Sequence, residues 1–287
     1  MIFLGGPGRS GTSFVADRVQ RHPQVASYHD VELKIFFEAD GLFDLRSVLC
    51  RDYSPNRATV AVRRFDNLVQ MLMNGGFAQP KILSLEASEK LRDAFSNFRA
   101  ALYPHGFSPP RSYTKFDSAA RNLVGAISSA AMQQKPSSIA FLEKTPHNLL
   151  AAEFLHQLYP DAKFIHVIRR PEAIAVSLLS QNWGPNDIET AAVWVRSYLE
   201  VWQRTRTFMV EHGLPLFELR IEDVSTDPRQ ASLAICGFLE IEPLEELFFG
   251  ASSDVLDRWR EKVDEHKSTI LAKTLSHLSV ELGYQKE

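Results

Sequence analysis

The sequence has few of the residues and segments that would take it out of an ordinary globular class. Only two cysteines, Cys50 and Cys236, occur in 287 residues, which excludes a disulfide framework. No apolar run approaches the roughly 18 residues of a membrane span. The N-terminus has no basic region followed by an apolar stretch, so we expect a cytoplasmic chain that is complete at its front end.

An excess of positive charge is also missing. The 32 Lys and Arg residues are balanced by 35 Asp and Glu residues, giving a formal net charge of −3. Without a basic field, nucleic acid is not an expected partner. Hydrophobic residues at 45% and charged residues at 23% are ordinary for a globular protein. An anionic ligand would therefore have to be bound by a few arginines and backbone N–H groups.

One further absence concerns a single residue in a glycine-rich turn. The apolar run Met1–Leu4 leads directly into Gly5–Ser13, whose sequence is GGPGRSGTS. Counted from Gly6, the spacing is G-x-x-x-x-G-x-S, which is the skeleton of a nucleotide P-loop. Thr12 stands where that motif has its lysine, and Arg9 supplies a positive charge earlier in the turn.

This turn has the features of an anion-binding site. Its backbone N–H groups precede an amphipathic helix that is expected at about 14–21, and a helix N-terminus binds anions. Arg9 adds charge, and Ser10, Thr12 and Ser13 add hydroxyl donors. Ser10 or Thr12 is expected to cap the helix. The alternative is a plain strand-to-helix turn that needs glycine only for its backbone angles.

Strands and helices alternate along most of the chain, which predicts an α/β fold with a P-loop-type central parallel sheet flanked by helices. We expect one domain over 1–287. Residues 36–137, rich in aromatic side chains and without a clear strand, are expected to form a helical insertion within it. The expected strands are 2–6, 25–28, 139–142, 163–168 and 216–219, and the expected helices outside 36–118 are about 14–21, 119–134, 149–158, 171–180, 188–211, 228–239, 254–264 and 270–282.

A second candidate anion site follows the strongest strand signal, KFIHVI. Arg169 and Arg170 come directly after it, and Ser177 lies about two helical turns into the next helix. An arginine at a strand end and a serine on the facing helix can hold a second phosphate, although a surface arginine pair with an exposed serine is the alternative. The turns at 5–13, 143–146 and 169–171 all follow strands. Because ligands bind at the carboxyl ends of parallel strands, we take these turns together.

These motifs together resemble the PAPS-dependent sulfotransferase family, where PAPS is 3′-phosphoadenosine 5′-phosphosulfate. The resemblance also includes His22-Pro23 after the first helix, and it covers about residues 1–38 and 139–260. Arg9 matches the tyrosylprotein and bacterial branches, which have arginine in place of lysine. The resemblance implies that Arg169 and Ser177 bind the 3′-phosphate. It also implies that the 5′-phosphosulfate is bound by Gly8, Arg9, Ser10, Gly11, Thr12 and Ser13.

The same resemblance implies a carboxylate general base shortly after the first helix. Glu32, in the stretch E-L-K, is the first candidate. Asp30 is its rival because an ungapped match from Arg9 reaches it, and His29 is a weaker rival because histidine is the base in cytosolic members. For each of them the alternative is an exposed loop charge.

Three other residues are interpreted from their surroundings. Lys144, in E-K-T-P, resembles the lysine that faces the transferring group in heparan-type members, although an ion pair with Glu143 or a surface carboxylate is the alternative. The stretch R-I-E-D-V resembles the family's Y-E-D-L, but Ile221 replaces the tyrosine, so Glu222 is expected to be structural. His166 lies inside an apolar strand and is expected to be a core histidine.

The reaction implied is in-line transfer of a sulfuryl group from PAPS to a hydroxyl, or less favourably an amine, of a small-molecule or glycan acceptor. Glu32 would accept the acceptor's proton, while Arg9 and Lys144 would stabilise charge on the leaving oxygen, with PAP as the product. No metal is expected, because sulfuryl carries less charge than the phosphoryl group that Mg²⁺ neutralises. Residues 36–137 are expected to form an acceptor pocket or lid, or plain core. The acceptor and the oligomeric state stay open.

Two other classes of function also stay open. A P-loop kinase or NTPase needs the missing lysine and a strand-end acid for Mg²⁺. Glu143 could supply that acid, whereas the strongest strand ends in two arginines. A non-catalytic nucleotide-binding protein would keep the fold, but it would have no reason to retain Glu32, Asp30 and Lys144.

Overall fold

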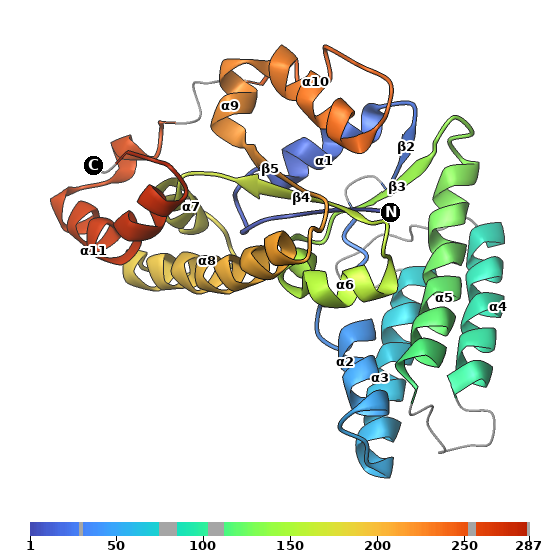
Figure 1. Cartoon of the computed structure of the whole chain (residues 1–287). Helices are drawn as coiled ribbons and strands as arrows, with labels where there is room; N and C mark the ends of the chain where they lie inside the picture. The colour runs from blue at the N-terminus through green and yellow to red at the C-terminus, as the bar shows by residue number, and fades with distance from the viewer. Residues whose placement is uncertain (29–30, 75–84, 103–111, 252–256, 286–287) are drawn as a thin grey trace. The chain divides into compact units, whose positions relative to one another are not determined.

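The computed structural model describes residues 1–28, 31–74, 85–102, 112–251 and 257–285 (Figure 1). It confirms an α/β fold, mostly helical, with a sheet of order β2-β3-β1-β4-β5. The pairings with a defined register are all parallel. In the part of the chain described, no helix is both long and apolar enough to cross a membrane. The strands are β1 (Ile2–Gly5), β2 (Val25–Ala26), β3 (Ala140–Glu143), β4 (Lys163–Ile168) and β5 (Leu216–Arg220).

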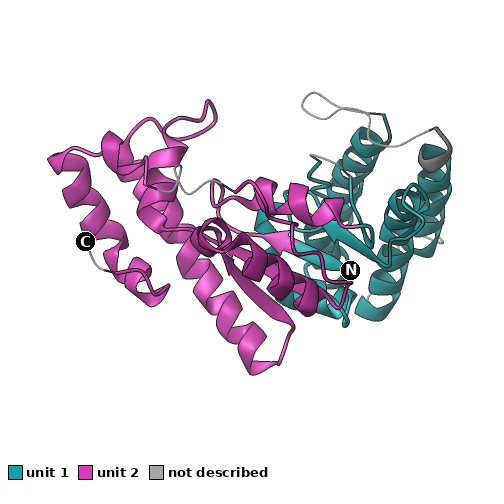
Figure 2. Cartoon of the chain, turned by 90° about the horizontal axis from the view of Figure 1, so that it is seen from above, with its two compact units in different colours: residues 1–3, 23–162 teal, residues 4–22, 163–287 magenta. Residues whose placement is uncertain are grey.

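The chain divides into two compact units, shown in Figure 2. Unit 1 consists of residues 1–3 and 23–162, and unit 2 of residues 4–22 and 163–287. β1 contributes its first residues to unit 1 and its last residues to unit 2. The organisation as one domain over 1–287 stays a prediction.

Unit 1 holds the helical insertion expected from the sequence. Within it, α4 and α5 pack along each other, and Figure 1 shows α2 to α5 side by side. Phe65, Phe98 and Phe116 are buried there, with ring centroids 5.5 and 5.9 Å apart along the series, so these aromatics form core. The helices of the unit are α2 (Leu42–Cys50), α3 (Pro55–Asn74), α4 (Leu85–Leu102), α5 (Tyr113–Gln133), the 3₁₀ helix η1 (Pro146–Ala151) and α6 (Ala152–Leu158).

Unit 2 is built around β4 and β5, which pair in parallel from Phe164 opposite Leu216 to Ile168 opposite Arg220. In Figure 1, α1, α9 and α10 lie on one side of these strands, and α7, α8 and α11 on the other. The helices of the unit are α1 (Thr12–Arg21), α7 (Pro171–Leu178), α8 (Ile188–Glu211), α9 (Ile221–Thr226), α10 (Pro228–Leu239), the 3₁₀ helix η3 (Arg260–Lys262) and α11 (Glu265–Glu281).

The start of α1 differs from the expectation. Gly11 is the N-cap residue, with a left-handed φ of 101°, and no side chain caps the helix, so the expected cap from Ser10 or Thr12 is wrong. The reason is that the N-cap position falls on Gly11, which has no side chain, and Thr12 is already inside the first turn. The first N–H groups of α1 therefore have no side-chain cap.

The end of the chain also differs from the expectation. The predicted helix over 254–264 falls partly outside the described residues, and its remainder is limited to the short η3. α11 begins at Glu265, earlier than expected, because Asp264 accepts a hydrogen bond from the Lys267 N–H at 2.9 Å and caps the helix. α9, six residues directly after β5, was not expected from the sequence.

His166 is a core histidine, as its strand context predicted. Its side chain is 1% exposed and its ring stacks on Trp202 with centroids 3.8 Å apart. Neither ring nitrogen has a hydrogen-bond partner among the described residues. Burial lowers the pKa of His166 from 6.5 to about 3, and Arg206 adds to the effect. The imidazole is therefore neutral in the folded protein at neutral pH.

This burial predicts a pH dependence of stability. Below about pH 6.5 the unfolded chain protonates His166, whereas the folded chain does so only near pH 3, so stability falls as the pH drops through this window. Between pH 7 and pH 5 the wild type should lose about 2 kcal/mol more than His166→Phe, which keeps a ring against Trp202. Urea unfolding at both pH values measures this difference, and a constant loss from the substitution cancels. Equal losses in the two proteins would contradict the prediction.

Candidate active site

The turn after β1 contains two glycines, Gly6 and Gly11, at positions that disfavour any other residue. Gly6 has a φ of +154°, and a Cβ atom there would lie 2.6 Å from the carbonyl oxygen of Val167 in β4. Gly11 has a φ of +101°, and a Cβ atom there would lie 3.0 Å from Ile221 Cδ1. Both positions need glycine for backbone angle and for close packing. The glycine spacing therefore does more than permit a tight turn.

Arg9 is the residue on which the contacts of this turn converge. Its backbone lies in the left-handed region, with a φ of 70°, which costs a non-glycine residue about 1–3 kcal/mol and is typical of functional sites. Its Nε donates to Ser177 Oγ at 3.2 Å, and its carbonyl oxygen accepts from Arg169 Nη1 at 3.0 Å. The structure thus brings together Arg9, Arg169 and Ser177, three residues that the sequence had placed in two separate motifs.

The surroundings of these arginines favour an anion. Burial lowers the pKa of Arg169, Arg9 adds to the effect, and Glu222 opposes it. Glu222 Oε1 accepts from the Arg170 N–H at 3.0 Å. Three arginines and one carboxylate therefore take part in these contacts, and the excess of positive charge suits a ligand with more than one negative group.

The remaining residues of the turn lie at different depths. Ser10 is fully buried, and its hydroxyl has no partner among the residues described. Thr12 is buried and Ser13 is exposed, while Gly8 lies against Trp183, whose Cη2 would be 3.5 Å from a Cβ atom placed there. Trp183 is 61% exposed. The sequence reasoning missed it, because a lone tryptophan in a loop carries no recognisable spacing.

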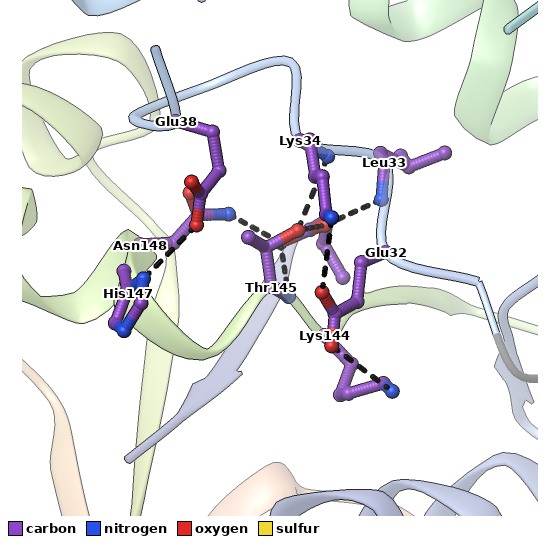
Figure 3. A network of polar contacts seen from close by, with 9 residues as sticks. Glu32, Leu33, Lys34, Glu38, Lys144, Thr145, His147 and Asn148 are labelled. Carbon is purple, nitrogen blue, oxygen red and sulfur yellow. Dashed lines mark hydrogen bonds and ion pairs between the residues drawn. The ribbon is translucent and has the colours of Figure 1, made fainter. Parts of the chain in front are cut away.

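A second cluster of charged residues lies in unit 1 and is drawn in Figure 3. Lys144, directly after β3, is buried, and its Nζ lies 3.7 Å from Glu32 Oε1. Lys34 Nζ lies 3.9 Å from the other oxygen of Glu32. The two candidates Glu32 and Lys144 therefore meet. The rival candidates Asp30 and His29 lie outside the described residues.

Both carboxylate oxygens of Glu143 accept hydrogen bonds from other residues of the chain. It is 1% exposed, and it accepts hydrogen bonds from the Leu33 N–H at 3.3 Å, the Thr145 N–H at 3.1 Å, the Thr145 hydroxyl at 2.6 Å and the Asn148 side chain. Burial raises the pKa of Glu143, and these donors oppose the rise. With both oxygens engaged in this way, Glu143 is poorly suited to be the strand-end magnesium ligand of a kinase.

The same residues hold the segment that carries Glu32. Thr145 Oγ1 accepts from the Lys34 N–H at 3.2 Å, and Asn148 Oδ1 accepts from the Phe37 N–H at 3.3 Å. Because the Thr145 hydroxyl also donates to Glu143, it links Lys34 to the buried carboxylate. Side chains thus satisfy backbone groups that a strand ladder would otherwise satisfy.

His147 and Glu38 form a further pair at this cluster, with His147 Nδ1 3.0 Å from Glu38 Oε1 (Figure 3). The hydrogen bond to Glu38 raises the pKa of His147, and the same bond lowers the pKa of Glu38. The sequence reasoning missed both residues, as well as the roles of Thr145 and Asn148. Their only signal is that they flank the E-K-T-P and E-L-K stretches that were recognised.

Thr145→Val tests the link between the two segments. The valine keeps the shape of threonine but removes the hydroxyl that serves Lys34 and Glu143, so the free energy of unfolding should fall by about 1–3 kcal/mol. Urea unfolding measures the loss, and amide exchange at Lys34 should become faster. Thr145→Ser keeps the hydroxyl and is the matched control. If serine and valine cost the same, the hydroxyl does not hold this segment.

A family model described as Sulfotransferase family matches residues 2–246. Nodulation protein NoeE of Sinorhizobium fredii (strain NBRC 101917 / NGR234) is 25% identical over 184 residues, which are 64% of this chain and 32% of that protein. The chain thus spans about a third of the length of that curated relative.

Two solved structures are similar in fold. The sulfotransferase domain from the Synechococcus PCC 7002 olefin synthase has a TM-score of 0.52 at 16% identity, covering 99% of this chain and 94% of that one. The sulfotransferase domain from the curacin biosynthetic pathway has a TM-score of 0.54 at 12% identity, covering 100% and 98%. At these identities the likeness establishes the fold.

Proposed function

The chain belongs to the sulfotransferase family, and on this premise we propose that it transfers a sulfuryl group from PAPS to a hydroxyl group of a small-molecule or carbohydrate acceptor. An amine is the less favoured acceptor. The observation that carries the proposal is the contact of Arg9 with both Arg169 and Ser177 in unit 2. It joins the two motifs that the resemblance assigns to the two ends of one nucleotide.

The residues of unit 2 fit a ligand with two anionic groups. The turn offers the N–H groups at the start of α1, which no side chain caps, together with the buried Ser10 hydroxyl, which has no partner among the described residues. These groups and Arg9 would hold the 5′-phosphosulfate. Arg169 and Ser177 would hold the 3′-phosphate. Thr12, in place of a lysine, makes this set a poor match to a nucleoside triphosphate with Mg²⁺.

The residues of unit 1 fit the proton transfer that sulfuryl transfer requires. Glu32 is a half-buried carboxylate beside Lys144 and would accept the proton of the acceptor hydroxyl, a contribution of typically about 10²–10⁴-fold in rate. Lys144 would stabilise negative charge that develops in the transition state. Glu143, Thr145 and Asn148 hold the segment that carries Glu32, so they would fix the direction of the base.

Arg9 and the N–H groups of the turn would stabilise the oxygen that leaves with the 5′-phosphate. Donors placed in advance at such an oxygen contribute about 3–4 kcal/mol each in comparable acyl-transfer sites. Arg9 is suited to this because a guanidinium has further N–H donors besides the Nε that contacts Ser177. The helices α2 to α5 are the proposed binding region for the acceptor. Phe65, Phe98 and Phe116 belong to the core of these helices.

Binding of PAP, compared with AMP, tests the nucleotide assignment. The wild type should bind PAP without Mg²⁺ and more tightly than AMP, and Arg169→Ala should reduce that preference by about 10- to 100-fold through loss of a charged contact. Isothermal titration calorimetry measures both ligands. Arg229→Ala, which removes an exposed ion pair with Glu245 in the same unit, should change neither affinity. Binding of ATP with Mg²⁺ but not of PAP would refute the proposed function.

Glu32→Gln tests the base. The variant should keep its affinity for PAP but lose about 10²–10⁴-fold in turnover, because the amide cannot accept the proton. Turnover is measured with labelled PAPS and a panel of hydroxylated acceptors. Asp30→Asn is the matched variant of the rival carboxylate. If Asp30→Asn abolishes turnover and Glu32→Gln does not, Asp30 is the base.

A further inference from the structure

Residues 282–285, which follow α11, contact the loop after β4, the last residue of β5 and the start of α9 in unit 2. Tyr284 is 9% exposed, and its hydroxyl donates to Glu222 Oε2 at 2.9 Å. Its ring lies 5.0 Å from the guanidinium carbon of Arg170 and 4.6 Å from that of Arg220. The tyrosine thus contacts three charged side chains, which come from the loop after β4, the last residue of β5 and the start of α9.

The backbone of residues 282–285 also accepts hydrogen bonds from these two arginines. Arg170 Nη1 donates to the Gln285 carbonyl oxygen at 3.4 Å, and Arg220 Nη2 donates to that of Leu282. Gly283 has a φ of +79°, and a Cβ atom there would lie 2.5 Å from Arg220 Nη2. The left-handed φ favours glycine at this position, and a side chain there would also displace the end of the Arg220 side chain.

Glu222 connects this segment to the arginines of the candidate phosphate site. One of its oxygens accepts from the Tyr284 hydroxyl, and the other accepts from the Arg170 N–H at 3.0 Å. The neighbouring Arg169 donates to the Arg9 carbonyl oxygen at 3.0 Å, and Arg9 donates to Ser177. A continuous series of contacts therefore runs from the end of the chain to the glycine-rich turn.

We propose that Tyr284 is a positioning residue for the binding of the nucleotide's 3′-phosphate, an inference that rests on the proposed function. By holding Glu222, the tyrosine fixes the backbone at Arg170 and keeps a carboxylate oxygen from drawing Arg169 away from Arg9. Glu222 acts on the pKa of Arg169, which it raises against the lowering by burial, so the carboxylate and this guanidinium attract each other. Burial raises the pKa of Tyr284 and Glu222 adds to the effect, so the hydroxyl stays protonated and donates.

Tyr284→Phe tests this role because it removes only the hydroxyl. The affinity for PAP should fall by about tenfold while that for AMP changes by less than about twofold, since only PAP has the 3′-phosphate. In turnover, the KM for PAPS should rise with kcat unchanged. Amide exchange at Arg170 should become faster. Calorimetry, steady-state kinetics and exchange mass spectrometry measure the three quantities.

Tyr28→Phe is the matched control, because Tyr28 is also a buried tyrosine whose hydroxyl donates to a single oxygen, that of Ile127, at 2.8 Å in unit 1. It should lower the melting temperature without changing the ratio of PAP to AMP affinity. An unchanged ratio in Tyr284→Phe would overturn the positioning role and leave Tyr284 a purely structural residue. A wild type that does not distinguish PAP from AMP would instead refute the proposed function.

Discussion

The close approach of the first turn to β4 is the constraint on which the contacts of Arg9 with Arg169 and Ser177 depend. A Cβ atom at Gly6 would lie 2.6 Å from the Val167 carbonyl oxygen, so only glycine lets the turn pass there. From that position the chain reaches Arg9 in a left-handed conformation, and the carbonyl oxygen of Arg9 meets Arg169 from the end of β4. The strain at Arg9 is thus offset by contacts that no relaxed turn would make.

Unit 1 also contains an unfavourable local feature, the buried carboxylate of Glu143. Burying Glu143 without partners would cost several kcal/mol, and hydrogen bonds from Leu33, Thr145 and Asn148 offset that cost. Because the Leu33 N–H is one of the donors, stabilising the carboxylate also fixes the segment next to Glu32. The left-handed backbone of Arg9 and the burial of Glu143 are each unfavourable alone. In both cases the hydrogen bonds that offset the cost also fix the neighbouring residues in place.

The sequence was sufficient for features that repeat or follow a fixed local spacing. Strand β4 and helices α8 and α10 were predicted to the residue, because their apolar periodicity and flanking signals are strong. Arg169 and Ser177 could be proposed together from the sequence because they lie eight residues apart on one strand–helix unit. The start of α1 was not predictable, because the left-handed conformation of Gly11 places the N-cap between the two candidate residues Ser10 and Thr12. Tyr284 and Glu222, 62 residues apart, meet only through the fold.

The missing lysine has a physical explanation in this arrangement. An ammonium group is a compact point charge with three rotatable donors, and one contact does not orient it. A guanidinium is a planar fork, so the single bond from Arg9 Nε to Ser177 fixes the plane in which its other donors lie. That serine belongs to α7, the helix after β4, and Arg169 lies in the loop between β4 and α7. Arginine at position 9 therefore links the glycine-rich turn to the loop and the helix that follow β4.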